Sequence, residues 1–392
     1  MFGIFFRTAI RNRSKQAWPP LKRVFPRIRL DRERKRKMSD KNDIRNRAAG
    51  AVMGALIGDA LGLGPHWYYD LEQMRKDYGS WIDGYTDPQP GRYHEGLKAG
   101  DLSQTGLITL ELLESLAEKG EYDEADFTRR LDERILSNMD GSAQSGPGGY
   151  TNQSIRELYR ARGVAEKPWG RTGDYADTTE AAERAVVLAA RYASSPADGA
   201  RFISSNIRLT HVDPFVAALS ISFCTVVGAL IRGLPFDGEL SSTLYALVEK
   251  GDLPFTHAVL AENRDKYHQA PASPSATLPF PDGLLFPSHV WRAAKDPDVN
   301  IDPAWKVSLV YGMPCSIVCM LPAAYYLAAR YQDDFEKAVL HAVNGGGQNM
   351  SRAMLTGALV GAQVGISGIP RRFIDGLSDS GAILALAEKV AA

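Results

Sequence analysis

Two stretches of small residues at helical spacing limit the folds that this chain can adopt. In the later stretch, residues 344–365 read NGGGQNMSRAMLTGALVGAQVG, and Gly357, Ala358, Gly361 and Ala362 recur at helical intervals. A glycine inside a helix costs about 1 kcal/mol relative to alanine, so this regular placement predicts that another backbone passes very close. We therefore expect a buried helix that packs tightly against a second one.

A run of three glycines, residues 345–347, precedes that helix. Glycine adopts positive φ angles without steric cost, so we expect a turn that leaves residues 348–351 facing a cleft at the helix N-terminus. The N-terminus of a helix attracts anions. The turn and the start of the helix together predict a ligand site.

The earlier small-residue stretch, Gly54–Gly62, reads GALIGDALG. Its glycines are four residues apart and share one helical face, which permits the same close packing. Alternating runs of valine, isoleucine and threonine, which would indicate strands, are scarce along the whole chain. The sequence predicts an all-α fold, a single multi-helix bundle.

These two stretches resemble the ADP-ribosylglycohydrolase family. The first helix of that family reads Gly-Ala-x-x-Gly-Asp-Ala-Leu-Gly, and its late motif reads Gly-Gly-Asp-x-Asp-(Ser/Thr) followed by small residues at helical spacing. Two further segments match, Leu209–Pro214 (LTHVDP) and Gly365–Pro370 (GISGIP). The resemblance covers about residues 48–375 and implies the helical bundle of that family.

Two aromatic segments narrow the resemblance to one branch. Residues 64–69 read GPHWYY and residues 93–101 read YHEGLKAGD, and both are similar to segments of J-type crystallins and selenoprotein J. Aromatic side chains with polar tips suit the wall of a ligand pocket. They are also common at the boundary between a core and its surface.

The resemblance also implies where metal would bind. The family holds two Mg²⁺ ions with a glutamate, a Thr-Asp-Asp triplet, and the two aspartates and hydroxyl of the late motif. Mg²⁺ prefers oxygen ligands that include carboxylates, and the equivalent positions here carry none. We therefore expect no metal cofactor and impaired catalysis. By spacing, the equivalent positions are His66, Ser103, Gln104, Thr105, Gln348, Met350 and Ser351.

A ligand site can outlast the loss of catalysis, because a helix N-terminus needs no acid to attract a phosphate. Several members of the expected set have an equally plausible structural role. Asp59 could cap a helix or lie in the core, and His211 and Asp213 could only support a helix start. The residues expected to contact a ligand are Asp59, His66, Gly346, Gly347, Gln348, Asn349, Ser351, His211 and Asp213.

Two functions follow from the resemblance. The first is a catalytically impaired protein that binds an ADP-ribose-type ligand or serves as a crystallin-like structural protein. The alternative is an active hydrolase that cleaves an ADP-ribosyl glycosidic bond on a protein or a small molecule. Its acid and base would come from His66, His94 or His211, and replacement metal ligands from Asp59, Glu95 or Asp101. The catalytic residues and the oligomeric state stay open.

The N-terminal 38 residues differ in composition from the rest. Of the 46 basic and 46 acidic residues, 13 and two lie in residues 1–38, which leaves 33 and 44 in residues 39–392. The segment is predicted to be unfolded and to precede one helical domain, residues 39–392. It suits a transit peptide, a basic tail or an extension upstream of a start at Met38. The expected location is cytoplasmic, or mitochondrial or plastid if the segment is a transit peptide.

The acidic body of the chain argues against nucleic acid as its partner, because such binding relies on lysine and arginine. No apolar run is expected to reach the ~18–20 residues that span a bilayer. Cys315 and Cys319 are predicted to be buried thiols.

Apolar periodicity predicts the remaining helices, and two irregular segments interrupt them. The glycine-rich loop Asp140–Gly149 could wrap a phosphate or ribose or be a plain connector, and the proline-rich residues 265–303 are expected to be a surface excursion or a lid. The predicted helices are Asn46–Leu63, Leu102–Lys119, Glu124–Ser137, Asn152–Arg162, Thr178–Ala193, Pro196–Ile207, Phe215–Arg232, Trp305–Tyr331 and Phe335–Val343.

Overall fold

The structure, a computed structural model, describes residues 25–255 and 281–391, with side chains described from residue 42 onward. The chain divides into two compact units, Met1–Asn42 and Asp43–Ala392. Residues 1–24 of the basic extension lie outside the described residues. The domain boundary predicted after residue 38 stays a prediction.

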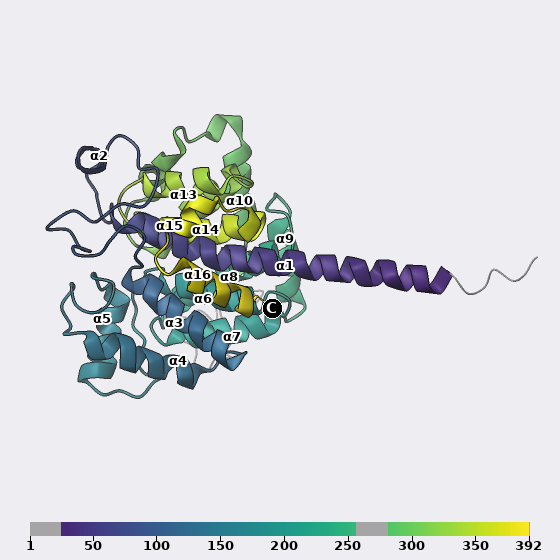
Figure 1. The fold of residues 1–392 in the computed structure, drawn as a ribbon, viewed down its shortest axis with the longest axis horizontal. Helices are drawn as coiled ribbons and strands as arrows, with labels where there is room; N and C mark the ends of the chain where they lie inside the picture. Colours follow the sequence, from purple (N-terminus) through teal and green to yellow (C-terminus); the bar gives the residue numbers. More distant parts are fainter. Residues whose placement is uncertain (1–24, 256–280, 392) are drawn as a thin grey trace, which may run out of the picture. The chain divides into compact units, whose positions relative to one another are not determined.

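The described residues form helices and three isolated β-bridges but no strand, so the all-α prediction is confirmed (Figure 1). Two helices, α4 and α5, continue into the π-helical turns Leu131–Ile135 and Arg160–Val164. The α-helices are α1 (Phe25–Leu63), α2 (Leu71–Tyr78), α3 (Gln104–Lys119), α4 (Glu124–Arg130), α5 (Gln153–Tyr159), α6 (Glu180–Arg191), α7 (Pro196–Arg208), α8 (Pro214–Ile231), α9 (Leu240–Glu249), α10 (Phe286–Lys295), α11 (Val307–Tyr311), α12 (Ile317–Arg330), α13 (Phe335–Val343), α14 (Asn349–Val364), α15 (Arg371–Gly376) and α16 (Ser380–Val390).

The two small-residue helices meet backbone to backbone, as the sequence predicts. A Cβ atom on Gly54 of α1 would lie 2.2 Å from the carbonyl oxygen of Gly357 of α14, and one on Gly357 would lie 2.0 Å from the carbonyl oxygen of Gly54. Gly50 and Gly361 repeat this contact one turn away. Only glycine permits so close an approach, and the contact holds the N-terminus of α14 beside the end of α1.

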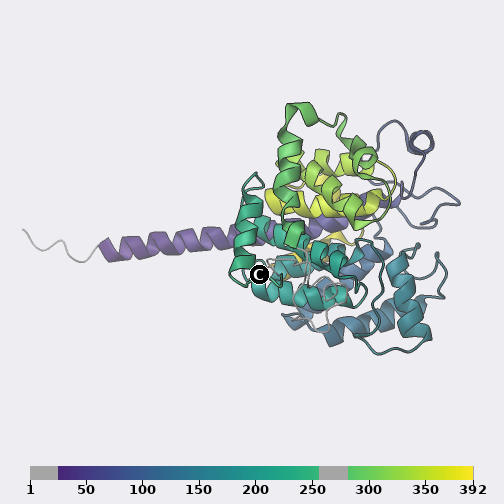
Figure 2. The ribbon, with the colours of Figure 1, turned by 180° about the vertical axis from the view of Figure 1, so that it is seen from behind.

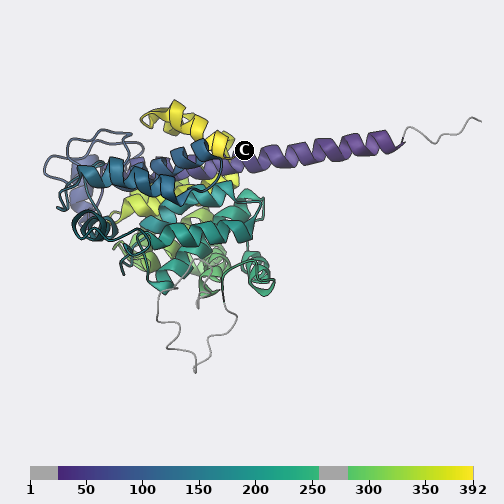
Figure 3. The same cartoon turned by 90° about the horizontal axis from the view of Figure 1, so that it is seen from below.

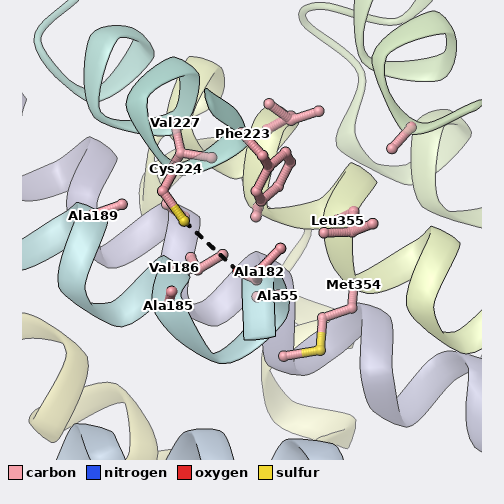
Figure 4. Packing of buried hydrophobic residues seen from close by; sticks show 14 of the residues in the cluster. Ala55, Ala182, Ala185, Val186, Ala189, Phe223, Cys224, Val227, Met354 and Leu355 are labelled. Carbon is pink, nitrogen blue, oxygen red and sulfur yellow. Dashed lines mark hydrogen bonds between the residues drawn. The ribbon is translucent and has the colours of Figure 1, made fainter. Parts of the chain in front are cut away.

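The core of the second unit lies where α6, α8, α12 and α14 pack against one another. Figure 4 shows Ala55, Val186, Phe223 and Met354 in this core, with the Cys224 thiol directed at the carbonyl oxygen of Ala182 at 3.8 Å. In the view of Figure 1, α3, α4, α5 and α7 lie in one half of the unit and α10, α13 and α14 in the other. Figure 2 shows the same division from behind.

Helix α8 departs from one sequence expectation. It has the length and hydropathy of a membrane span over Pro214–Ile231, although no apolar run of that length was expected. In the structure 89% of this span is buried inside the protein, as in the central helix of a protein core. Its apolar character is accounted for by contacts with α6, α7 and α14.

Several helix boundaries differ from the prediction. Helix α1 begins at Phe25 rather than at residue 46, and residues 305–331 form two helices, α11 and α12, instead of one. Part of the proline-rich excursion is the regular helix α10, while residues 256–280 lie outside the described residues. Figure 3 shows α15 and α16, in yellow, on the outside of the unit, where α16 packs against α3.

Candidate functional site

The glycine turn before α14 is closed by backbone hydrogen bonds. Gly346 and Gly347 adopt positive φ angles of 62° and 59°, as the sequence predicts. The amide of Gly347 donates to the carbonyl of Tyr68 at 2.7 Å, and the amide of Gln348 donates to the carbonyl of Met313 at 2.8 Å. These two amides are therefore not free to cradle a phosphate; of the four residues 348–351 expected to face a cleft, this engages only the backbone amide of Gln348.

A chain of buried polar side chains lies beside this turn. The Nδ1 atom of His66 lies 2.7 Å from Nε2 of His94, and its Nε2 atom lies 2.8 Å from the side-chain amide of Gln348. The other end of that amide lies 2.8 Å from Oγ of Ser351. The four side chains are only 1–5% exposed. The structure thus brings together three predicted site residues and His94, which the sequence offered only as an acid or base of the alternative hydrolase.

The hydrogen-bond partners of His94 and His66 determine which nitrogen of each imidazole carries a proton. Nδ1 of His94 lies 2.9 Å from the carbonyl oxygen of Gly148, which can only accept, so this nitrogen carries a proton. Burial lowers the pKa of His94 to about 4 and that of His66 well below its usual value. With both rings neutral, His66 donates from Nδ1 to His94, and its bare Nε2 must accept from Gln348. We therefore assign the Gln348 amide with its nitrogen toward His66.

Asp59 is fully buried and supports the start of α3. It accepts hydrogen bonds from the amide of Ser103 at 2.8 Å and from the hydroxyl of Ser103 at 2.6 Å. A Cβ atom on Gly106 would lie 2.2 Å from Oδ2 of Asp59. Burial raises the pKa of Asp59 to about 6 despite the hydrogen bonds from Ser103. Both carboxylate oxygens are engaged, which fits the structural alternative for Asp59.

Gln104 and Thr105, in the first turn of α3, contact the glycine-rich loop and the residues that follow it. Nε2 of Gln104 donates to Oγ1 of Thr151 at 3.1 Å, while Oε1 of Gln104 is buried without a hydrogen-bond partner among the described residues. Nδ2 of Asn152 donates to Oγ1 of Thr105 at 3.3 Å. Nε2 of Gln104 also donates to the carbonyl of Pro147 at 3.3 Å, which attaches the loop itself to α3.

Three predicted site residues have structural contacts instead. Met350 packs in the contact between α1 and α14, because a Cβ atom on Gly62 would lie 2.4 Å from its Cα. Asp213 caps α8 by accepting from the amides of Phe215 at 2.8 Å and Val216 at 3.1 Å. Nδ2 of the buried Asn349 donates to the carbonyl of Val343 at 3.4 Å.

Two buried glutamates at the start of α6 are functional candidates that sequence reasoning missed. Oε2 of Glu180 accepts from the Thr178 hydroxyl and lies 3.5 Å from Nε2 of His211. Oε1 of Glu183 accepts from the Thr179 hydroxyl at 2.5 Å. Glu180 and Glu183 are 4% and 1% exposed. The available signal was a pair of acids three residues apart in a helix otherwise rich in alanine and valine.

The electrostatics of the two glutamates differ. Burial, followed by the charge of Glu180, raises the pKa of Glu183 to about 8. Burial also opposes ionisation of Glu180, but the hydrogen bond and charge of His211 outweigh it and lower the pKa of Glu180. The positions equivalent to the family's metal ligands carry no carboxylate, but a carboxyl group outside them lies beside Ser351, because Glu183 hydrogen-bonds Ser351 and senses the charge of Asp59.

Three aromatic side chains beside the histidines, those of Trp67, Tyr93 and Tyr150, form an aromatic wall. The rings of Trp67, Tyr93 and Tyr150 contact one another with centroids 4.8–5.0 Å apart, and His66 stacks on Trp67 at 5.5 Å. Tyr69 is 51% exposed, and its pKa is raised by partial burial and then by neighbouring Cys315 and Tyr150. The wall connects the buried polar chain to the surface.

The described histidine and carboxyl side chains of this region do not form a metal centre. Within residues 25–255 and 281–391, no group of three or more histidine, cysteine, aspartate or glutamate side chains is arranged to hold a metal ion. His66 has both nitrogens engaged. Of the alternative ligands considered, Glu95 accepts from the amide of Gly91 at 2.9 Å, and Asp101 accepts from the hydroxyl of Ser378 at 2.7 Å.

Comparison with known proteins gives a consistent result. Residues 40–392 match the family model described as ADP-ribosylglycohydrolase. The chain is 27% identical over 340 residues to an uncharacterised protein of Archaeoglobus fulgidus, covering 86% of this chain and 94% of that protein. A solved structure described as an ADP-ribosylglycohydrolase-related protein complex superposes with a TM-score of 0.58 at 19% identity, covering 89% of this chain and 98% of that one. The structural likeness concerns the fold.

Proposed function

The chain belongs to the ADP-ribosylglycohydrolase family, and from this membership we propose that it binds an ADP-ribose-type ligand without the two Mg²⁺ ions of the family and does not run their metal-dependent hydrolysis. The observation that carries the proposal is the neutral, fully hydrogen-bonded chain of His94, His66, Gln348 and Ser351. Three of its members, His66, Gln348 and Ser351, stand at positions that the sequence resemblance equates with metal ligands of the family.

The side chains at those positions do not fit Mg²⁺. His66 and Gln348 satisfy each other, the Ser103 hydroxyl donates to Asp59, and Met350 offers only a thioether sulfur. Mg²⁺ requires near-octahedral oxygen coordination, usually with a carboxylate that offsets its charge. Asp59 and Glu183, two buried acids that contact Ser103 and Ser351, have raised pKa values and already accept hydrogen bonds. No step of the proposed function uses a metal.

The aromatic wall is the part of the site that suits a nucleotide-like ligand. Ligand pockets are lined mainly by aromatic and apolar side chains with a few polar groups. Trp67, Tyr93, Tyr150 and the exposed Tyr69 supply such a lining next to the buried histidines. The similarity of the segments at residues 64–69 and 93–101 to J-type crystallins favours a crystallin-like structural protein if no ligand binds.

Calorimetric titration with ADP-ribose tests the proposal. We expect binding that is roughly micromolar to millimolar, equal with Mg²⁺ and with EDTA, and at least tenfold weaker in Tyr69→Ala. Tyr245→Ala on α9, a helix that carries none of these groups, is the matched control. Absence of binding would leave the crystallin-like role. Hydrolysis of ADP-ribosylated peptides that requires Mg²⁺ would contradict the proposal.

The alternative, an active hydrolase that cleaves an ADP-ribosyl glycosidic bond, needs an acid and a base other than metal-bound water. One observation favours it, because Glu180 and Glu183 are two buried carboxyl groups with opposite pKa shifts near this site.

A further inference from the structure

The glycine-rich loop, residues 140–149, lies directly against His94 at one end of the buried polar chain. The carbonyl oxygen of Gly148 accepts a hydrogen bond from Nδ1 of His94 at 2.9 Å, and a Cβ atom on Gly149 would lie 3.2 Å from the Cα atom of His94. The four side chains of the buried polar chain are only 1–5% exposed. A ligand can therefore contact them only after a covering segment has moved. The members of that chain are His94, His66, Gln348 and Ser351.

The same loop also covers the first turn of α3. A Cβ atom on Gly148 would lie 2.1 Å from the backbone nitrogen of Gln104 and 2.5 Å from the carbonyl carbon of Ser103. Nε2 of Gln104 donates to the carbonyl oxygen of Pro147 at 3.3 Å, and this side chain is only 1% exposed. The loop backbone therefore rests on the backbone of α3 without room for a side chain between them.

The glycine-rich loop is held in shape by its own groups and by the residue that follows it. The amide of Ser142 donates to Oδ1 of Asp140 at 2.8 Å, and the hydroxyl of Ser145 donates to the carbonyl of Ser142 at 3.1 Å. Thr151 donates from its amide to the carbonyl of Ala143 at 2.9 Å and from its hydroxyl to the carbonyl of Ser145 at 2.6 Å. A compact loop of this kind can move as one unit.

Two side chains fasten the loop to the rest of the protein. Apart from the adjoining Thr151, the described residues outside the loop donate only two hydrogen bonds to it, from Nδ1 of His94 and from Nε2 of Gln104. On its outer side the loop is open to solvent, because residues 142–144 are exposed. Breaking two hydrogen bonds is therefore the main step in lifting it.

Glycines stand at both ends of the loop. Gly141 has a φ angle of 86°, and Gly148 and Gly149 have φ angles of 80° and 81°. Hinges in proteins are a few loop positions that absorb a change in φ and ψ, and glycine does so with the least steric hindrance. The loop can thus bend on each side of its compact part.

The closed position of the loop leaves one buried group unpaired. Oε1 of Gln104 has no hydrogen-bond partner among the described residues, although Nε2 of the same side chain is engaged. A buried acceptor without a partner costs free energy, which water or a ligand donor would recover. The closed position is therefore not the arrangement that best satisfies Gln104.

The other segments beside the buried polar chain are fixed by backbone contacts. In the glycine turn, the amide of Gly347 donates to the carbonyl of Tyr68 at 2.7 Å, and the amide of Gln348 donates to the carbonyl of Met313 at 2.8 Å. Helix α14, which follows the turn, meets α1 backbone to backbone. Proteins open first where the fewest contacts hold a segment, and here that segment is the glycine-rich loop.

We propose that the glycine-rich loop is a lid whose opening admits the ligand to the buried polar chain. Its hinges are Gly141, Gly148 and Gly149. Its latch consists of His94 and Gln104. Opening releases the N–H groups of the latch from the two loop carbonyls, so that they can donate to acceptor oxygens of the ligand, and it lets Oε1 of Gln104 accept. The identity of the ligand rests on the proposed function, whereas the opening is a property of the free protein.

The first test needs no ligand, because His94 itself reports the opening. Diethyl pyrocarbonate modifies imidazoles that it can reach, and mass spectrometry of the digested full chain gives the modification rate of each histidine. His289 on α10 is exposed and serves as the internal reference. We expect His94 to react more slowly than His289, at a rate that stays constant in urea below the unfolding transition, because opening a lid exposes little surface.

Gly148→Ala should hold the lid open, since the added Cβ would lie 2.1 Å from a backbone atom of α3. We expect it to raise the modification rate of His94 about tenfold through loss of the latch hydrogen bonds, with the thermal melt retained. Gly170→Ala is the matched control, because Gly170 has a similar φ angle of 88° but an added Cβ would meet no atom within 4 Å. Its rate should stay within about twofold of the wild type. Modification of His94 that requires global unfolding, and is equal in both variants, would reject the lid.

The second test follows ADP-ribose binding by stopped-flow fluorescence. Binding behind a lid must wait for the lid to open, so the observed rate should reach a plateau as the ADP-ribose concentration rises. Gly148→Ala should remove the plateau and Gly170→Ala should keep it. A rate that rises linearly in the wild type and is unaffected by Gly148→Ala would reject the lid and leave the proposed function intact. Absence of ADP-ribose binding, with His94 modified as expected, would overturn the proposed function and leave the lid.

Discussion

Replacing Gly54 by alanine tests whether the close contact between α1 and α14 holds the fold together. The added Cβ would lie 2.2 Å from the carbonyl oxygen of Gly357 and 3.1 Å from the Phe335 ring. Cβ atoms in folded proteins essentially never approach another heavy atom more closely than 3.0 Å. The backbones must therefore separate by roughly 1 Å, since neither carbonyl nor helix can rotate away.

The cost follows from what that separation removes. A gap of about 1 Å forfeits up to half of the dispersion energy between facing atoms, and overpacking a tight core costs about 1–3 kcal/mol and sometimes more. Here the clashing atom belongs to the backbone and cannot move aside, so we take the cost of overpacking to be about 4 kcal/mol. Alanine gains about 1 kcal/mol over glycine in a helix interior. The net destabilisation is about 3 kcal/mol, equivalent to a fall in Tm of roughly 4 °C for a domain of this size.

Urea denaturation of Gly54→Ala and of a matched control measures this directly. The control is Gly381→Ala in α16, where an added Cβ would meet no atom within 4 Å, and we expect its stability to be unchanged or raised by up to about 1 kcal/mol. If Gly54→Ala is as stable as Gly381→Ala, the two helices are not in backbone contact and the reasoning fails.

Two further predictions concern charge in the core. Because the folded-state pKa of Glu183 is raised to about 8 from its usual 4.5, the folded state binds the extra proton and stability should fall as pH rises from about 4.5 through 8, by roughly 3–5 kcal/mol in all. Urea melts of the wild type and Glu183→Gln between pH 5 and 8.5 check this, and equal slopes would contradict it. Millimolar Mg²⁺ or Mn²⁺ should leave Tm unchanged, since a ligand stabilises only by binding the native state; a rise of several degrees, or tight stoichiometric binding by calorimetry, would show that a metal site exists.

The fold was predictable because close helix packing requires small residues at helical intervals, and that spacing can be read from the sequence. Gly50, Gly54, Gly357 and Gly361 recur at helical spacing, and the structure places them in two pairs of touching backbones. The positive φ angles of Gly346 and Gly347 follow from the same kind of local argument. Steric constraints on the backbone act between residues that are near in sequence or on one helix face. They can therefore be predicted from the sequence.

The partners of those segments were not predictable in this way. Whether the amide of Gln348 faces a cleft or donates to the carbonyl of Met313 depends on a loop far away in the sequence. Asp59 could equally have contacted a ligand, until the structure placed Ser103 on both of its carboxylate oxygens. Hydrogen bonds between distant residues leave no periodic signal, because either partner is compatible with many others.

The sequence by itself therefore determined that this chain is an all-α bundle of the ADP-ribosylglycohydrolase family, and it predicted the positions at which the family's acids would stand. Only the tertiary structure decided that His66 and Gln348 satisfy each other and that Glu180 and Glu183 are buried nearby. Propensity and packing at helical spacing are properties of a segment. The protonation of a buried carboxyl or imidazole is set by desolvation and by neighbours that folding alone brings within hydrogen-bonding distance.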